Sequence, residues 1–339
     1  MQHQYKRDPH EIFQNTPIRR RHSWPAFRAG AGRPAGPVHH SQRHPRLRVY
    51  RLGLNNSGGT DSGAAFSGSC DSSGGLNIND ATSPGGDSNA YDNAWNLYVD
   101  DAIFNVGDIV DLTGTTITAG PTLMSGLNVT VEYFFATTAG LARIRPIFQN
   151  PTGSPITVTV DVPVNFGSDS GTVYEMTSSG DGVVTTADRW VVSSDGGGEF
   201  NTLVWYGPGT PAVTPSGYTT SVFDCSDPDG LGASFSVTIP AGATRSLVFF
   251  AGLGAITDTT DSLAGAISAA ATFDAPLASL PGEWLTGMTA TDISEALNWE
   301  GGGLGGPTAI PTLSQWSLMV LGALLALIGL TAHRRRAAG

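Results

Sequence analysis

Short runs in which apolar and polar side chains alternate fill the middle of this 339-residue chain, and they constrain its fold more than any other feature. In residues 156–164 (ITVTVDVPV), Ile or Val occupies every second position up to Val162. A period of two places the apolar side chains on one face of a β-strand. The turn sequence Asn-Pro-Thr-Gly at 150–153 connects this run to another apolar run at 141–148. We therefore predict two strands joined by a tight connection.

Similar runs recur along residues 91–300, separated by turns that are rich in Gly and Asp. Further strand-like runs lie at 96–99, 102–106, 127–137, 172–176, 190–193, 202–206, 219–223, 234–239 and 246–250. Many short strands without long helices between them predict an antiparallel β-sandwich. Two helical patterns follow at 261–272 and 291–299, the second with Thr291 as its expected N-cap. We expect these helices to pack on the sandwich as a small C-terminal appendix.

Charge is distributed very unevenly along the chain. Residues 1–51 contain eleven Lys and Arg but only two acidic residues, whereas residues 52–315 contain twenty-seven Asp and Glu and only four Arg. An acidic body repels the phosphate backbone, so we expect no nucleic-acid partner. The same charge is suited to solubility outside the cell and to cation binding.

The first 90 residues lack the periodic apolar pattern of the body. Residues 1–51 are rich in Arg, His and Pro and contain no apolar run like that of a signal peptide. They are either a disordered basic head or the product of a start site assigned too early, and we favour the second because the C-terminal tail requires export. Residues 52–90 are rich in Gly, Ser and Asp and are predicted to be a linker or loops, so that the ordered body begins near Tyr91.

Histidine is absent from the acidic body. Six histidines lie in residues 1–51, and the seventh is His333. This excludes a Ser–His–Asp triad, a Cys–His pair and histidine-bound zinc between residues 45 and 332. A pair of carboxylates, as in glycoside hydrolysis, has no sequence signature, because it depends on a separation in space. We therefore expect a protein that is not an enzyme.

The C-terminus has the composition of a membrane anchor. Residues 316–332 are uncharged and mainly apolar, which is just long enough for a helix to cross a hydrocarbon core about 30 Å thick. Arg334, Arg335 and Arg336 follow, and such a basic cluster favours the cytoplasmic side. A single transmembrane helix is therefore predicted, with a Gly-rich spacer at 301–309 between it and an external body.

A short motif precedes the apolar span. It consists of Ile310, Pro311, Thr312 and Leu313, followed by Trp316. Together with the span and the arginine cluster, it resembles the IPTL-CTERM sorting signal, which is related to the PEP-CTERM signals read by exosortase-type enzymes. The resemblance covers residues 310–339. It implies a bacterial cell-envelope protein that is held in the membrane by its tail, cut near the motif by an exosortase-like sorting enzyme, and then displayed at the surface or released.

The body is also similar to uncharacterised β-rich bacterial ectodomains. The segments that carry this resemblance are residues 150–160, 167–172 and 178–192. This second resemblance implies a surface ectodomain and brings no activity with it.

One acidic turn is a candidate metal site. Asp224, Asp227 and Asp229 lie close together just before Gly230. Clustered carboxylates supply the oxygen ligands that Ca²⁺ prefers, although the alternating loop and final bidentate Glu of an EF-hand are absent. The alternative is an ordinary Asp/Gly turn on an acidic surface, and no other cofactor is expected.

Cys70 and Cys225 are the only cysteines in the chain. In an exported protein they can form one disulfide that closes a long loop. Two unpaired thiols are the alternative, because the sequence does not give the separation of their Cα atoms.

The aromatic residues and the tail together suggest the function. Trp190, Trp205 and Tyr206 lie in or beside strand patterns, where we expect core residues; an exposed row would instead stack on sugars. The expected function is a structural or adhesive protein of the cell surface or extracellular matrix. The alternative is a secreted glycan-binding module or carbohydrate-active enzyme, with surface polysaccharide as the partner.

Overall fold

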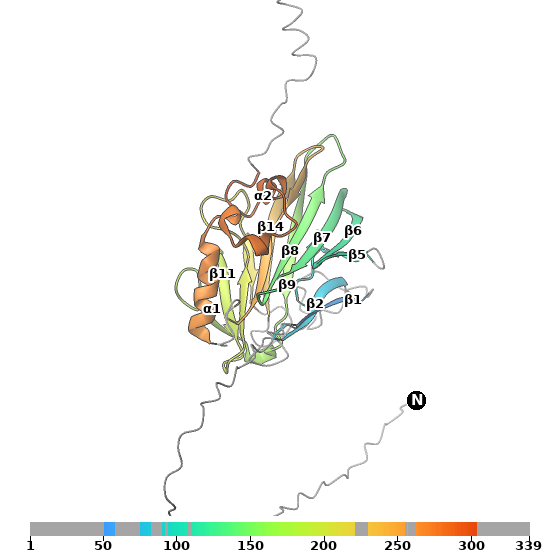
Figure 1. Ribbon diagram of the computed structural model, residues 1–339. Coiled ribbons are helices and arrows are strands. Elements are labelled where there is room, and N and C mark those ends of the chain that lie inside the picture. Colours follow the sequence, from blue (N-terminus) through green and yellow to red (C-terminus); the bar gives the residue numbers. More distant parts are fainter. Residues whose placement is uncertain are drawn as a thin grey trace, which may run out of the picture. The chain divides into compact units, whose positions relative to one another are not determined.

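A computed structural model describes residues 51–57, 75–82, 90–91, 94–106, 110–220, 230–254, 256 and 262–303. This part of the chain is mainly antiparallel β-structure with few helices, as the alternating runs predict. Its strands form two large sheets and a two-stranded sheet, which pairs β1 (Arg51–Ser57) with β2 (Gly75–Thr82). Figure 1 shows the strands of the two large sheets and the helices beside them.

The larger sheet has nine strands. In spatial order it contains β10 (Val173–Thr177), β11 (Trp190–Ser194), β12 (Phe200–Val204), β16 (Phe249–Leu253), β8 (Leu141–Gln149), β7 (Leu127–Phe135), β6 (Thr116–Met124) and β5 (Val110–Thr113), with β15 (Thr244–Ser246) also paired to β8. The smaller sheet has five strands. Its order is β13 (Gly217–Thr219), β14 (Leu231–Ile239), β9 (Ile156–Val164), β3 (Tyr98–Val99) and β4 (Ala102–Ile103).

The two sheets share one hydrophobic cluster, the arrangement expected of a sandwich. In β7 the buried and half-buried residues alternate along most of the strand, and the buried Val, Leu and Tyr side chains belong to this cluster. Phe249 of β16 lies among other aromatic rings. Its ring centroid is 5.4 Å from that of Phe235 in the smaller sheet, 6.0 Å from Trp205 and 6.1 Å from Trp95. The core between the sheets is therefore apolar and largely aromatic.

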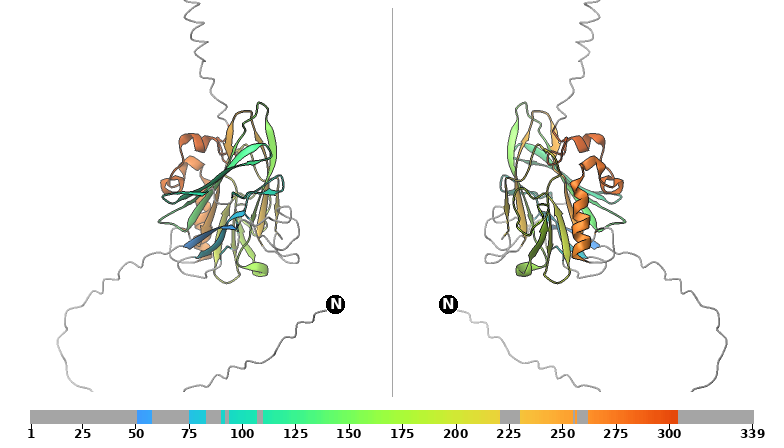
Figure 2. Two further views of the ribbon diagram at one scale, coloured as in Figure 1. Left: turned by 90° about the vertical axis from the view of Figure 1, so that its right-hand side faces the viewer. Right: turned by 90° about the vertical axis from the view of Figure 1, so that its left-hand side faces the viewer.

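The C-terminal segment (residues 262–303) covers the opposite face of the larger sheet. Its helices are α1 (Leu263–Ala270), η2 (Ala271–Asp274), η3 (Leu277–Ser279), η4 (Gly282–Leu285) and α2 (Ala290–Ser294); a further turn, η1 (Asp169–Gly171), lies outside this segment. Phe250 joins a second cluster with Phe273 and Trp299 of the segment. Because neighbouring side chains of a strand point to opposite faces, Phe249 and Phe250 place the two clusters on the two sides of one sheet. Figure 2 shows α1 running along this outer face.

Both predicted regions contain a helix that a side chain caps, although α2 ends at Ser294 and the predicted helix ran to residue 299. Ser262 Oγ accepts a hydrogen bond from the Gly265 amide at 3.2 Å at the start of α1. The N-cap of α2 is Thr289, so the prediction of Thr291 is wrong by two residues. Thr289 and Asp292 form a capping box, in which each side chain accepts from the other residue's amide, and this fixes the start of the helix.

The connection at residues 150–153 is tight, but the two strands that it joins do not pair with each other. β8 lies in the larger sheet, and β9 pairs with β14 and β3 in the smaller sheet. The buried Asn150 organises this crossing. Its side-chain amide donates to the carbonyls of Ser154 at 2.8 Å and Ile239 at 3.0 Å, and its Oδ1 accepts from the Thr152 amide at 2.9 Å. The turn therefore carries the chain from one sheet to the other.

Part of the segment predicted as a linker contributes to the core. In β2, Leu76, Ile78 and Ala81 are buried in the main cluster, and the Ile78 and Ala94 backbones exchange two hydrogen bonds of 2.8 Å. The ordered body therefore begins before Tyr91. The prediction was wrong because the surrounding Gly, Ser and Asp residues outweighed a short alternation of Leu76 and Ile78 with asparagines.

Candidate functional site

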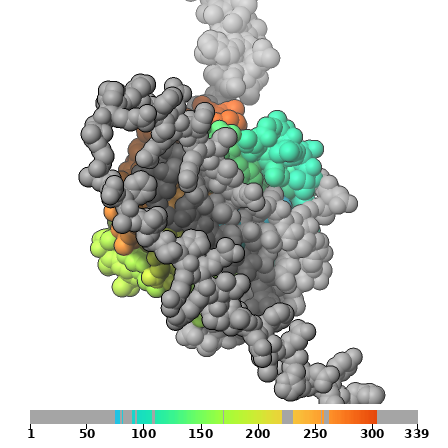
Figure 3. Space-filling model, turned by 60° about the horizontal axis from the view of Figure 1, so that its bottom comes forward, coloured from blue at the N-terminus to red at the C-terminus, as the bar shows by residue number. Residues whose placement is uncertain are grey.

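A groove of about 460 Å³ opens at one end of the larger sheet. It is lined by Thr113, Gly114, Thr115, Thr116, Glu132, Arg143, Thr286 and Gly287. These residues come from the β5–β6 hairpin, from β7 and β8, and from the loop between η4 and α2. Figure 3 shows the blue-green hairpin next to the orange C-terminal segment on one face of the molecule.

The local sequence explains how the two long walls of the groove form. Thr113 and Thr116 are opposite each other in the ladder, so that Gly114 and Thr115 make a two-residue turn. Gly114 has a φ of +62° and open space around it, and Gly287 in the opposite wall has a φ of +83°. Both conformations favour glycine, because a side chain is strained at positive φ. Two glycine turns therefore face each other across the groove.

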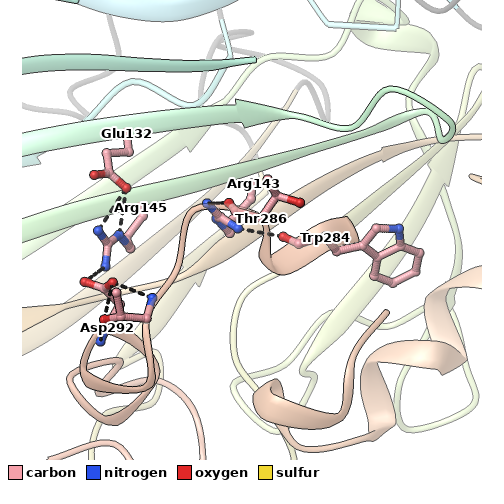
Figure 4. A network of polar contacts seen from close by, with 7 residues as sticks. Glu132, Arg143, Arg145, Trp284, Thr286 and Asp292 are labelled. Carbon is pink, nitrogen blue, oxygen red and sulfur yellow. Dashed lines mark hydrogen bonds and ion pairs between the residues drawn. The ribbon is translucent and has the colours of Figure 1, made fainter. Parts of the chain in front are cut away.

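The charged residues at the groove come from outward positions of β7 and β8. Glu132 and Arg145 are direct partners in the ladder, and Arg145 Nε and Nη2 donate to Glu132 Oε2 at 3.0 and 2.9 Å. Arg145 Nη1 also contacts Asp292 Oδ1 in α2 at 2.6 Å. Figure 4 shows this chain of contacts from the sheet to the C-terminal segment. One guanidinium thus joins a strand carboxylate to a helix carboxylate.

Arg143 is a second buried cation beside this ion-pair network. Its Nη1 donates to the Trp284 carbonyl at 2.7 Å, and its Nη2 donates to the Thr286 carbonyl at 3.0 Å. The guanidinium carbon lies 4.8 Å from the centroid of the Phe134 ring, a cation–π contact. Burial, helped by the nearby charge of Arg145, lowers the pKa of Arg143 to about 10, so it is still charged at neutral pH.

Asp292 has two structural roles at once, as a helix cap and as an ion-pair partner. Burial alone would raise the pKa of its carboxyl group, but the hydrogen bonds from Arg145 and Thr289 outweigh this effect and hold the pKa below its ordinary value. Asp292 is therefore ionised over the whole neutral range. Together, Glu132, Arg143, Arg145 and Asp292 make a charge group whose net charge is zero.

Two hydrogen-bonding groups at the groove are not used by the fold, one on the lining carboxylate of Glu132 and one on the buried guanidinium of Arg143. Both contacts from Arg145 to Glu132 go to Oε2, and Oε1 accepts no hydrogen bond from the part of the chain that the structure describes. Among the same residues, Arg143 Nε is buried without a partner. The threonine hydroxyl groups along the hairpin add donors and acceptors. Such a surface is chemically suited to binding a small polar molecule.

The residues predicted to form sites lie mostly outside the described residues. This holds for the calcium candidates Asp224, Asp227 and Asp229, for Cys70 and Cys225, for the motif Ile310–Leu313 with Trp316, and for Arg334, Arg335 and Arg336. Among the residues that the structure describes, no three His, Cys, Asp or Glu side chains come together as a metal site. No helix within the described ranges has the length and hydropathy needed to span a membrane.

The aromatic residues lie in the core, as expected from their strand patterns. Trp190, Trp205 and Tyr206 are all buried, and so are the other tryptophans of the described ranges, Trp95, Trp284 and Trp299. Arg189, which precedes Trp190, forms an ion pair with Asp274 at 2.6 Å. The part of the chain that the structure describes therefore has no exposed row of tryptophans for stacking on sugars.

The sequence contained one signal for the groove that composition alone did not reveal. Arg143 and Arg145 are two of only four basic residues in residues 52–315, and they occupy alternate positions within an apolar run. Charges repeated with a period of two in a strand point to one face. That pattern indicates a charged partner above the strand, which the structure identifies as the C-terminal segment.

Comparison with solved structures finds distant similarities. Heparan sulfate lyase HepC from Pedobacter heparinus is 12% identical with a TM-score of 0.32, and the match covers 49% of this chain and 24% of the lyase. A polysaccharide lyase is 10% identical with a TM-score of 0.38, with coverages of 60% and 32%. A galactose mutarotase related enzyme from Lactobacillus acidophilus is 9% identical with a TM-score of 0.31, with coverages of 55% and 93%. The chain thus spans less than a third of either lyase.

One expectation from the sequence is corrected. The prediction that the protein is not an enzyme is withdrawn, because missing histidines exclude only histidine-dependent chemistry. No curated protein sequence matches the chain significantly. A family model does match its C-terminal end, over residues 308–336. That end of the chain is an IPTL-CTERM motif.

Proposed function

We propose that this is a cell-envelope protein whose body is displayed at the surface after an exosortase-like enzyme has cut its tail near residues 310–313. The IPTL-CTERM motif at residues 308–336 carries this proposal, because the motif marks an exported protein that a sorting enzyme processes. In this scheme the apolar residues 316–332 hold the tail in the membrane, and Arg334, Arg335 and Arg336 stay on the inner side. The displayed body has a structural or adhesive role.

The end of the folded body supports a processing site close to its surface. The Gly302 amide donates to the Trp299 carbonyl at 3.0 Å, and the Gly303 amide donates to the Ser294 carbonyl at 3.1 Å. Only residues 304–309 separate this anchored end from the motif. Six extended residues span at most about 22 Å. The motif would therefore begin within about that distance of the folded body.

The test separates membrane retention from cleavage in the native host. Replacing Pro311 and Thr312 with alanine should block processing and leave a larger, membrane-retained species, because the extended cleavage region is altered while the span is unchanged. Replacing residues 334–336 with glutamine should instead weaken retention. Pulse-chase labelling, fractionation and mass measurement of the mature C-terminus report both effects.

The matched control replaces Ser314 and Gln315, which lie between the motif and Trp316, with alanine; it should be processed normally. The proposal fails if mature wild-type protein still carries residues 333–339. In that case the tail is a permanent anchor.

A further inference from the structure

The groove between the β5–β6 hairpin and the C-terminal segment has a mixed lining. No large apolar side chain contributes to it: the lining residues are four threonines, two glycines, Glu132 and Arg143. Threonine methyl groups and glycine α-carbons supply apolar atoms, and hydroxyl, carboxylate and peptide groups supply hydrogen bonds. Its volume of about 460 Å³ falls within the range of roughly 300–1,000 Å³ that is usual for small-molecule sites.

Charge narrows the class of ligand that this groove can hold. Glu132 and Asp292 balance Arg143 and Arg145, so the groove is locally neutral inside a strongly acidic body. An anion would meet Glu132 and the overall negative charge, and a cation would meet the two guanidinium groups. An apolar ligand would desolvate the free carboxylate oxygen of Glu132 without giving it a donor. A neutral ligand rich in hydroxyl groups avoids all three penalties.

We propose that this groove binds a short neutral saccharide, with Glu132 Oε1 as the acceptor for its hydroxyl groups and the hairpin threonines as further partners. Arg145 binds the carboxylate of Glu132 through Oε2 alone. This contact fixes the orientation of the carboxylate and leaves Oε1 available to the ligand. Arg143 fixes the opposite wall through the carbonyls of Trp284 and Thr286. The acceptor and the wall formed by the C-terminal segment are therefore held in place before a ligand arrives, which lowers the entropic cost of binding. This inference concerns the body alone and does not depend on cleavage of the tail.

The test uses the purified full-length chain and a defined set of probes. Cellobiose, maltose and lactose are the neutral saccharides, and glucuronate and glucosamine are the anionic and cationic counterparts. Saturation-transfer NMR detects binding, and calorimetry gives the dissociation constants. We expect at least one neutral disaccharide to bind at millimolar or lower concentration, and both charged sugars to bind more weakly.

Variants locate the binding in the groove. Glu132→Ala should weaken the neutral disaccharide about tenfold, because one hydrogen bond to a charged group is lost. The double variant Thr113→Val, Thr115→Val should also weaken it, and this change lies on a solvent-facing hairpin where the fold is least affected. The matched control is Thr130→Val in β7, since Thr130 is half-buried like Thr115 but does not line the groove.

The inference is overturned if none of the neutral disaccharides binds, if a charged sugar binds more tightly than all of them, or if binding is unchanged in the hairpin variant. Equal weakening by Thr130→Val would also overturn it, because the ligand would then be elsewhere on the sheet.

Discussion

The two faces of the larger sheet are covered in different ways. The inner face packs on the smaller sheet through apolar and aromatic side chains, with Phe249 among three other rings. The outer face packs on the C-terminal segment through a smaller apolar cluster together with the contacts of Arg143 and Arg145. Apolar burial does not titrate, whereas ion pairs and charged hydrogen bonds depend on pH and are screened by salt. The outer covering should therefore open separately and under milder conditions.

The largest loss of stability is expected from a substitution that disrupts the packing of the inner face. Phe249→Ala removes a fully buried ring and should lower the free energy of unfolding by about 3–5 kcal/mol, because a cavity replaces its contacts. Urea denaturation monitored by tryptophan fluorescence measures this loss. Leu123→Ala is the control, since Leu123 is 71% exposed, and it should change stability by less than about 0.5 kcal/mol. Similar losses in both variants would contradict the assignment of the core.

A smaller loss of stability is expected from a substitution that removes polar contacts between the outer face and the C-terminal segment. Arg143→Met leaves the carbonyls of Trp284 and Thr286 without their donors and should cost about 2 kcal/mol. Hydrogen exchange should show faster opening of residues 283–299, with the inner strands still protected. Arg189→Met is the matched control. Its ion pair with Asp274 is between partly exposed side chains, so the cost should stay below about 1 kcal/mol.

Uniform loss of protection across both faces in Arg143→Met would contradict this separation. It would mean that the C-terminal segment and the sandwich unfold as one unit.

The smallest effect is expected from Asp292, whose contribution to stability is lost at acidic pH. The pKa of Asp292 is lower in the folded protein than the value of about 3.9 expected in the unfolded chain. Its contribution is therefore fully present above the unfolded pKa and is lost as the pH falls through the folded pKa. Asp292→Asn should cost about 1 kcal/mol at pH 7, a modest value because the side chain is 21% exposed. Unfolding free energies measured from pH 7 to pH 3 should converge for wild type and variant at the acidic end.

Glu295 changes the stability with pH in the opposite direction, because burial raises the pKa of its carboxyl group. Its contribution to stability grows as the pH falls. The charge of Asp292 also raises the pKa of Glu295, so Asp292→Asn reduces this rise and the comparison of the two proteins cancels the Glu295 contribution only in part. Parallel curves at all pH values would show that the Arg145–Asp292 pair is not formed.

Local patterns in the sequence predicted most strands from β7 onward, but they missed β1, β2, β5 and β6. The alternation in β7 and β9 is an intrinsic property of a strand with one buried face, so each was located to within about two residues. The partner of β9 was not predictable in the same way. β9 pairs with β14, which begins at Leu231, while its neighbour in sequence, β8, belongs to the other sheet. Pairing depends on contacts distant in the chain, and alternation does not specify them.

The alternate arginines Arg143 and Arg145 indicated a partner above β8, but the groove as a whole was not predictable, for a related reason. Its residues come from the hairpin at 113–116, from Glu132, from Arg143 and from the loop at 286–287, and none of these stretches has a recognisable motif. Only the fold brings them together. Four threonines and two glycines also carry no signal of their own, because the same residue types fill ordinary turns.

The outer covering of the sheet has a consequence for the timing of folding. An exported chain emerges from the membrane with its N-terminus first, so residues 262–303 follow every strand of both sheets. Until they arrive, Phe250 and Trp190 face water. The step that completes the body therefore immediately precedes the emergence of the sorting motif at residues 308–336. A sorting enzyme would therefore act on that motif just after the C-terminal segment has packed on the sheet and completed the folded body.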